Sequence, residues 1–165
     1  MDVMARYMDA RVRFLVEESG FFESNFLALE GLIHRERFSA MFGLVGMAEC
    51  VNDLLAKEGI EGRFGHSEAA DKLGVEIMEQ INAFCNAHPA PYCEATGGHY
   101  LLHAQVGIDS DKHSSPGTRI PIGEEPAELI DHLKNINLFH KYFISGAGDI
   151  FPVDLTCLLY TSPSP

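Results

Sequence analysis

Apolar residues recur close to helical spacing through the first part of the chain. Between residues 3 and 18 they mark one side of a predicted helix, and Gly20 follows as its end. A second, mostly helical segment is expected from residue 38 to about residue 57, with Gly59 just beyond its C-terminus. The pattern therefore predicts helices as the main elements of this part.

The third predicted helix has the clearest boundaries. Ser67 can cap its N-terminus, and two prolines in the segment 88–91 stop it. The apolar residues at helical spacing between these limits predict a buried stripe, made of Leu73, Ile77, Ile81 and Phe84.

The second half has a different pattern. Residues 99–108 follow two glycines and predict a strand, and residues 109–117 form a loop rich in Asp, Ser, Pro and Gly. A short extended segment is expected at 119–123, a short helix at 126–135, and another strand at 140–144. Helices followed by strands with long loops predict an α/β or α+β fold and exclude a simple bundle.

Composition limits the classes of protein to which the chain can belong. Its 165 residues, 46% of them hydrophobic, suffice for the core of one domain. The formal charge of −12 comes from 24 acidic against 12 basic residues, and no cluster of Lys and Arg offers a nucleic-acid surface. Solvated helix faces are the expected place of the acid excess.

Apolar runs and cysteines bear on the cellular location. No apolar run reaches the roughly 18 residues that a membrane span needs, so no membrane interaction is expected. No secretory signal accompanies the irregularly spaced cysteines, so a disulfide framework is not expected. These cysteines are Cys50, Cys85, Cys93 and Cys157. A reducing cytoplasm is the expected location.

Both ends are unusual for a complete protein. Met1 leads at once into a helical pattern, and residues 157–165 change composition abruptly. We expect residues 1–156 to be an internal fragment of a larger domain and residues 157–165 to be a non-native tail.

Glu49 and Cys50 lie side by side after an apolar run that Gly43 and Gly46 interrupt. A thiol can act as a nucleophile when it becomes a thiolate, or as a hydrogen-atom donor and acceptor when it becomes a thiyl radical. An adjacent carboxylate raises the pKa of a thiol, which argues against a thiolate nucleophile. The alternative is that Cys50 is a small buried apolar residue.

A strand over residues 99–106 would have one polar and one apolar side. Its polar side would carry His99, Leu101, His103 and Gln105, and its apolar side would carry Tyr100, Leu102, Ala104 and Val106. The polar side could hydrogen-bond a substrate inside a barrel, with His103 and Gln105 as the main candidates. The alternative is an ordinary solvent-facing side.

Arg119 lies in a segment bounded by Gly and Pro. Its guanidinium could bind a substrate carboxylate or phosphate through two parallel hydrogen bonds. Glu124 and Glu125 are alternative partners within the chain.

Two groups of residues have metal-ligating side chains without the spacing that metal sites use. The loop 109–117 could hold a hard cation, but it lacks a glutamate at the distance of a calcium loop. A second group lacks the paired cysteines of zinc sites, and its members are Cys85, His88, Cys93 and His99. We therefore predict no bound metal.

Two segments carry a resemblance to a known family. Residues 42–49, FGLVGMAE, and residues 65–78, GHSEAADKLGVEIM, resemble a block of the glycyl radical enzymes. Anaerobic ribonucleotide reductases have a similar pattern, and the YjjI family of glycine radical enzymes is closer. Residues 102–111, 115–126 and 145–151 resemble that family as well, so the likeness extends from about residue 14 to residue 154.

This resemblance implies a fold and a chemistry. The fold would be part of a ten-stranded α/β barrel made of two half-barrels. A radical stored on a C-terminal glycine would pass to a cysteine inside the barrel, and the thiyl radical would abstract a hydrogen atom from a small-molecule substrate under anaerobic conditions. A separate iron–sulfur activating enzyme that uses S-adenosylmethionine would install the radical, and a homodimer is a further option.

The chain departs from the family pattern at two points. It lacks the Arg-Val-x-Gly-Tyr/Phe type of loop that carries the stored radical, so we expect it to be inactive alone. Cys50 follows Ala48-Glu49 where the reductases have Asn-Glu. The resemblance assigns Cys50 as the radical-bearing residue and Glu49 as the proton-transfer or substrate-orienting partner. The thiyl cysteine of the reductases lies upstream, so an upstream cysteine is left open.

Two other hypotheses belong to different functional classes. One is a non-radical metal protein that uses His99, His103, Asp109 and Asp111. The other is an inactive structural or interaction domain in which Cys50 is only part of the core.

Overall fold

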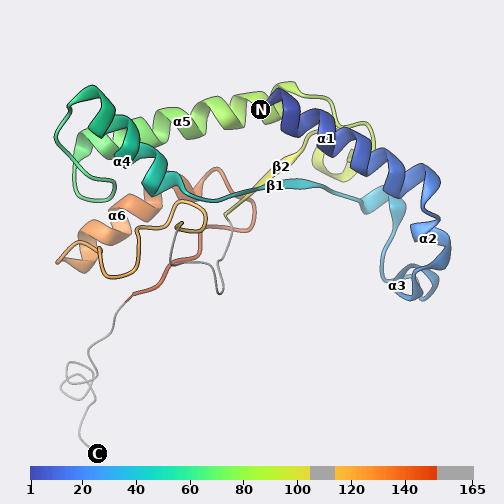
Figure 1. Ribbon diagram of the computed structural model, residues 1–165. Helices are drawn as coiled ribbons and strands as arrows, with labels where there is room; N and C mark the ends of the chain where they lie inside the picture. Colours follow the sequence, from blue (N-terminus) through green and yellow to red (C-terminus); the bar gives the residue numbers. More distant parts are fainter. Residues whose placement is uncertain (105–113, 152–165) are drawn as a thin grey trace, which may run out of the picture.

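The computed structural model describes residues 1–104 and 114–151, and it shows a mixed α/β fold (Figure 1). Six α-helices and two short strands account for most of this part of the chain. In chain order these elements are α1 (Asp2–Arg13), α2 (Phe21–Ser24), α3 (Phe26–Leu29), β1 (Met41–Leu44), α4 (Met47–Glu58), α5 (Glu68–Ala87), β2 (Leu101–Ala104) and α6 (Leu129–His140).

The two strands pair in parallel, with Met41 opposite Leu101 and Leu44 opposite Ala104. A parallel pair needs a long crossover connection, and α4 and α5 provide it. In Figure 1 the two strands lie side by side below α5, the longest helix of the described residues. The predicted α/β class is confirmed. The described residues form one parallel strand pair, and the ten-stranded barrel stays a prediction.

The prediction of a helix from residue 38 was wrong for its first part. Residues 41–44 form β1, and only Met47–Glu58 is helical. Gly46 separates the two elements because its φ of +82° lies in the left-handed region, which side chains rarely adopt. The predicted C-terminus is confirmed: Gly59, with φ of +67°, caps α4.

The first predicted helix is confirmed, and its apolar side is buried in part. A π-helical turn over Phe14–Glu18 extends α1, and Gly20 follows with φ of +63°. Of the apolar positions at helical spacing, Val12 is buried and Met8 packs against the core, whereas Met4 and Tyr7 are exposed at 55% and 66%. Ala5 and Val16 complete the buried side of this helical segment.

Helix α5 has the predicted boundaries. Ser67 Oγ accepts the N–H of Ala70 at 3.4 Å, and the helix ends at Ala87, two residues before Pro89. The predicted stripe is half-buried, and the fully buried side lies next to it: its residues are Ala70, Gly74, Met78 and Cys85.

Helix α6 begins at Leu129 rather than at Pro126 and continues to His140. The strand predicted at 140–144 was wrong. The N–H of Tyr142 donates to the carbonyl of Phe139 at 3.0 Å, so the chain turns directly after the helix. This turn places Phe143, four residues after Phe139, in the same core. The four-residue spacing of Phe139 and Phe143 therefore suits a helical turn over residues 140–143 better than an extended strand.

Helices α5 and α6 contact each other at Gly74, beside the rings of Phe64 and Phe139. These two ring centroids lie 5.4 Å apart. A Cβ atom on residue 74 would lie 2.9 Å from Phe64 Cε2 and 3.1 Å from Phe139 Cζ, closer than ordinary contact allows. The absence of a side chain at this position allows the two helices to approach.

We expect Gly74→Ala to destabilise the protein by about 1–3 kcal/mol in urea unfolding, because both rings are buried and cannot move aside freely. Helix propensity alone would have the opposite effect, a stabilisation of about 1 kcal/mol. Gln80→Ala, at an exposed position of α5, is the matched control and should be close to neutral. A stabilised Gly74→Ala variant would contradict the close contact.

Candidate functional site

Glu49 lies at the carboxyl end of the strand pair, where parallel α/β sheets commonly place their functional residues. It occupies the first turn of α4, five residues after β1 ends at Leu44. Its Oε1 atom accepts the backbone N–H of Ser115 at 2.7 Å. Its Oε2 atom is buried and has no hydrogen-bond partner among residues 1–104 and 114–151. One carboxylate oxygen is therefore fixed, and the other is an unused acceptor.

The backbone of Ser115 is inserted into the N-terminus of α4. In an ordinary capping box, a glutamate at the third helical position accepts the N–H of the N-cap residue. Here the N-cap is Gly46, and its N–H donates to the Ser115 carbonyl at 2.7 Å while Glu49 accepts the Ser115 N–H. A further bond of 2.8 Å joins the Gly117 N–H to the Leu44 carbonyl. We call this set of bonds the Ser115 clamp.

Cys50 does not share the environment of Glu49. Successive helical residues point about 100° apart, so the two side chains leave α4 in different directions. Cys50 is exposed, so the alternative that it is a small buried apolar residue of the core was wrong. Cys85 and Cys93 are buried in the core instead, and burial raises the pKa of both thiols.

The two predicted sides of the strand after His99 are confirmed for residues 100–104. Tyr100, Leu102 and Ala104 are buried, whereas His103 is half-buried on the other side. His103 Nδ1 lies 3.2 Å from the hydroxyl oxygen of Ser145. His99 precedes β2, and its buried Nδ1 has no hydrogen-bond partner in the described part of the chain. Gln105, Asp109 and Asp111 lie outside the described residues.

Arg119 is buried close to an acidic residue that the sequence did not single out. Burial raises the pKa of Asp149, and the Ile150 N–H, His132 and Arg119 each act in the opposite direction. His132 Nε2 lies 3.2 Å from Asp149 Oδ2, and the side chains of both residues are at most 4% exposed. These contacts connect the segment after Ser115 to α6 and to the segment before Phe151.

The two glutamates considered as partners of Arg119 have other contacts. Glu124 forms an ion pair with Arg63, and Glu125 accepts the N–H of Gly123 at 2.9 Å. The sequence pattern missed Asp149 and His132 because their contact depends on the fold. The one available signal is that His132 shares a helix face with Phe139, a buried residue of α6.

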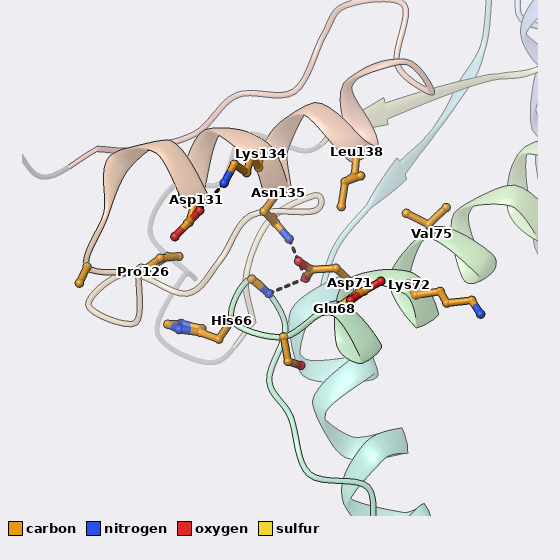
Figure 2. Close-up of a pocket in the computed structure, with 13 residues that line it drawn as sticks. His66, Glu68, Asp71, Lys72, Val75, Pro126, Asp131, Lys134, Asn135 and Leu138 are labelled. Carbon is orange, nitrogen blue, oxygen red and sulfur yellow. Dashed lines mark hydrogen bonds and ion pairs between the residues drawn. The ribbon is translucent and has the colours of Figure 1, made fainter.

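A pocket of about 830 Å³ lies between the N-terminal turn of α5 and α6 (Figure 2). Asp71 joins its two walls: Oδ1 accepts the Gly65 N–H at 2.7 Å and the Asn135 side-chain amide at 2.9 Å. Burial raises the pKa of Asp71, and these two donors oppose the rise. The other amide atom, Asn135 Oδ1, is buried without a hydrogen-bond partner.

The pocket and the Ser115 clamp are connected through Ile120. A Cβ atom added at Gly65 would lie 2.2 Å from Ile120 Cδ1, so the chain at Gly65 packs directly on the segment that follows Ser115. Gly65, with φ of +81°, belongs to the second segment that resembles glycyl radical enzymes. Two of the segments that carried the resemblance, residues 65–78 and 115–126, are thus in contact.

The structure does not form the zinc arrangement considered from the sequence, whose members are Cys85, His88, Cys93 and His99. Within residues 1–104 and 114–151, no group of three or more His, Cys, Asp or Glu side chains could hold a metal ion. In the same ranges, no helix is both long and apolar enough to cross a membrane.

A family model described as "Glycyl radical enzyme YjjI-like" matches residues 1–161. The chain belongs to the YjjI-like glycyl radical enzyme family. The resemblance found in the sequence is therefore confirmed.

Two curated relatives of this family are themselves named as uncharacterized. The chain is 48% identical over 152 residues to an uncharacterized protein of Haemophilus influenzae (strain ATCC 51907 / DSM 11121 / KW20 / Rd), which covers 90% of this chain and 29% of that protein. It is 45% identical over 149 residues to "Uncharacterized protein YjjI" of Escherichia coli (strain K12), covering 90% of this chain and 28% of that protein. No solved structure matches the chain.

We expect Glu49→Ala to destabilise the protein by about 1–2 kcal/mol, because it leaves the buried Ser115 N–H without its acceptor. Glu49→Gln should cost less, since an amide oxygen can still accept that N–H. Urea unfolding measures both variants, with Glu58→Ala, at the exposed end of α4, as the control. Equal effects of Glu49→Ala and Glu58→Ala would contradict the clamp.

The raised pKa of Asp71 predicts a pH dependence. The folded state binds the Asp71 proton more tightly than the unfolded state, so this group favours folding more as the pH falls. The stability of the wild type relative to Asp71→Asn should therefore increase from about pH 7 downward, and level off below the ordinary Asp pKa of about 3.9. Unfolding curves across this range test it, with the exposed Asp131→Asn as the control. A difference that is constant with pH would refute the prediction.

Proposed function

We propose that this chain is part of a glycyl radical enzyme that abstracts a hydrogen atom from a small-molecule substrate under anaerobic conditions. The family supplies the class of chemistry. The single observation that carries the site is the Glu49 carboxylate, which has a fixed Oε1 and a buried, unused Oε2 at the carboxyl end of the strand pair.

In this proposal Cys50 bears the thiyl radical. The substrate C–H bond breaks, an S–H bond forms at Cys50, and the unpaired electron passes to the substrate carbon. Glu49 Oε2 accepts a hydrogen bond or a proton from the substrate and so orients it. Because Cys50 is exposed in this chain, the proposal requires that other parts of the complete enzyme cover the first turn of α4. A cysteine outside this chain is the alternative radical carrier.

Four further residues are proposed to bind the substrate. His103 belongs to β2, His99 precedes the strand, and Gln105 follows it in the sequence, outside the described residues. Arg119 contributes positive charge near the Ser115 clamp, although its position beside Asp149 also gives it a structural role. These roles follow from position and chemical type.

The strand pair is proposed to belong to a ten-stranded α/β barrel. Parallel sheets are normally covered on both faces, and a two-stranded sheet has little stability alone. One side of β2 carries the half-buried Leu101 and His103, which would face the barrel interior. The chain spans only 28–29% of the length of its curated relatives, so the other strands of such a barrel would lie in the rest of those proteins.

The proposed partners follow from the radical chemistry. An activating enzyme with an iron–sulfur cluster and S-adenosylmethionine would install the glycyl radical in the complete enzyme. A reducing, anaerobic cytoplasm would preserve it, and a homodimer is the proposed assembly.

A structural role is the second candidate for Glu49, and the Ser115 clamp favours it. A carboxylate that only holds Ser115 would be replaceable by an amide without loss of chemistry. The two functions therefore differ in the effect of Glu49→Gln on radical transfer and turnover, since Gln keeps the bond to Ser115 but cannot take a proton.

The complete enzyme that carries this sequence, activated without oxygen, should show a glycyl EPR doublet. If the electron moves reversibly to Cys50, the exchangeable thiol hydrogen returns to the glycine, so the doublet should collapse to a singlet in D₂O. Cys50→Ala should keep the doublet and prevent the collapse, whereas the control Cys85→Ala should behave like the wild type. No doublet after activation would refute the proposed function, and collapse in Cys50→Ala would exclude Cys50 as the radical carrier.

A further inference from the structure

We propose that a second pocket, between α1 and the segment before β2, binds a small molecule that bears a diphosphate group. This pocket has a volume of about 440 Å³, within the range of small-molecule sites. Its lining includes Arg6, Arg13, Pro89, Pro91, Tyr92 and Tyr100. We call it the arginine pocket.

The arginine pocket is separate from the site at Glu49. Tyr100 immediately precedes β2, so the pocket lies at the amino end of the strand pair. Glu49 lies at the carboxyl end, and the two strands are parallel. The proposal therefore does not depend on the radical chemistry proposed above.

Two arginines of α1 point toward the same pocket. Arg6 and Arg13 are seven residues apart, which places them on one face of the helix about 10 Å apart along its axis. Both long side chains must therefore converge to contact one ligand. A diphosphate offers two sets of acceptor oxygens, so each guanidinium can bind its own phosphate group through the paired hydrogen bonds that arginine forms with phosphate.

The guanidinium groups of Arg6 and Arg13 are unpaired although acidic residues outnumber basic ones in the chain. Neither forms an ion pair with any residue of the described ranges 1–104 and 114–151. The nearest carboxylate on their helix face, Asp9, is already engaged. Its two oxygens each lie 3.0 Å from His88 Nε2, and Oδ1 also accepts the Tyr100 hydroxyl at 2.7 Å.

The second nearby carboxylate, Glu17, is engaged in a similar way because it accepts the hydroxyl of Tyr92. The N–H donors of Arg6 and Arg13 are thus unused within the described residues, whereas Asp9 and Glu17 already accept hydrogen bonds from other side chains. The negative charge of Asp9 remains in the pocket wall, so a weak monoanion should bind poorly. A ligand with several negative charges that contacts both arginines can overcome this repulsion.

The larger pocket beside Asp71 does not offer the same chemistry. Its lysines have acidic neighbours: Lys134 Nζ lies 2.8 Å from Asp131 Oδ1, and Lys72 Nζ lies 4.0 Å from Glu76 Oε1. Its charges are therefore largely balanced within the protein. The two arginines of the arginine pocket have no such ion pairs in the described ranges.

Isothermal titration of the full 165-residue chain with inorganic pyrophosphate and with ADP, at low ionic strength, tests the proposal. Both ligands should bind, and inorganic phosphate should bind about tenfold more weakly. Arg6→Gln and Arg13→Gln should each weaken pyrophosphate binding by about tenfold or more, because each removes one phosphate contact.

Arg11→Gln is the matched control, since Arg11 lies on another face of α1 and has the same charge. It should leave the affinity for pyrophosphate within about twofold of the wild type. Thermal melting of each variant checks that α1 remains folded. Absence of pyrophosphate binding, equal loss in Arg11→Gln, or equal affinity for phosphate and pyrophosphate would each overturn the proposal.

Discussion

The peptide of Ser115 holds together the part of the molecule where a strand becomes a helix. Its carbonyl accepts the N–H of Gly46 and its N–H donates to Glu49, both at 2.7 Å. Without this peptide, the Gly46 N–H and the Glu49 carboxylate would lose these partners at the start of α4, at a cost of about 1–3 kcal/mol for each. A segment about 70 residues away in the sequence therefore satisfies the helix terminus.

This arrangement gives Glu49 a structural and a chemical capacity at once. A carboxylate bound through one oxygen has little rotational freedom, so its second oxygen is held in a defined direction. A functional group must be held in a fixed position by its neighbours. A flexible side chain loses conformational entropy when it does this, so it is a costly neighbour. A backbone N–H is a rigid donor. The same bond that stabilises α4 therefore prepares Oε2 to accept a hydrogen bond from another molecule.

Local signals in the sequence predicted local structure well and long-range structure poorly. Ser67, Gly59 and the prolines after α5 act within one or two turns of a helix, and the boundaries they predicted are confirmed. Strand β1 exists because it pairs with β2 across about 60 residues, which no local pattern records. The same contrast between local and long-range features applies to the candidate site. Glu49 could be singled out from its neighbours, whereas the proximity of Asp149 to Arg119 could be known only from the fold.

Three aspartates show why the acidic composition is more than a solvated surface. Asp9 joins α1 to His88 and Tyr100, Asp71 joins Gly65 to α6, and Asp149 contacts His132 of α6. Burial raises the pKa of Asp71 and of Asp149, which means that desolvation outweighs the favourable contacts of the charged form. Such groups contribute little net stability, but each can satisfy donors from segments distant in sequence. Their effect is to specify which segments meet. Asp149 interacts with Arg119, four residues after Ser115, and so helps to hold the segment of the Ser115 clamp beside α6.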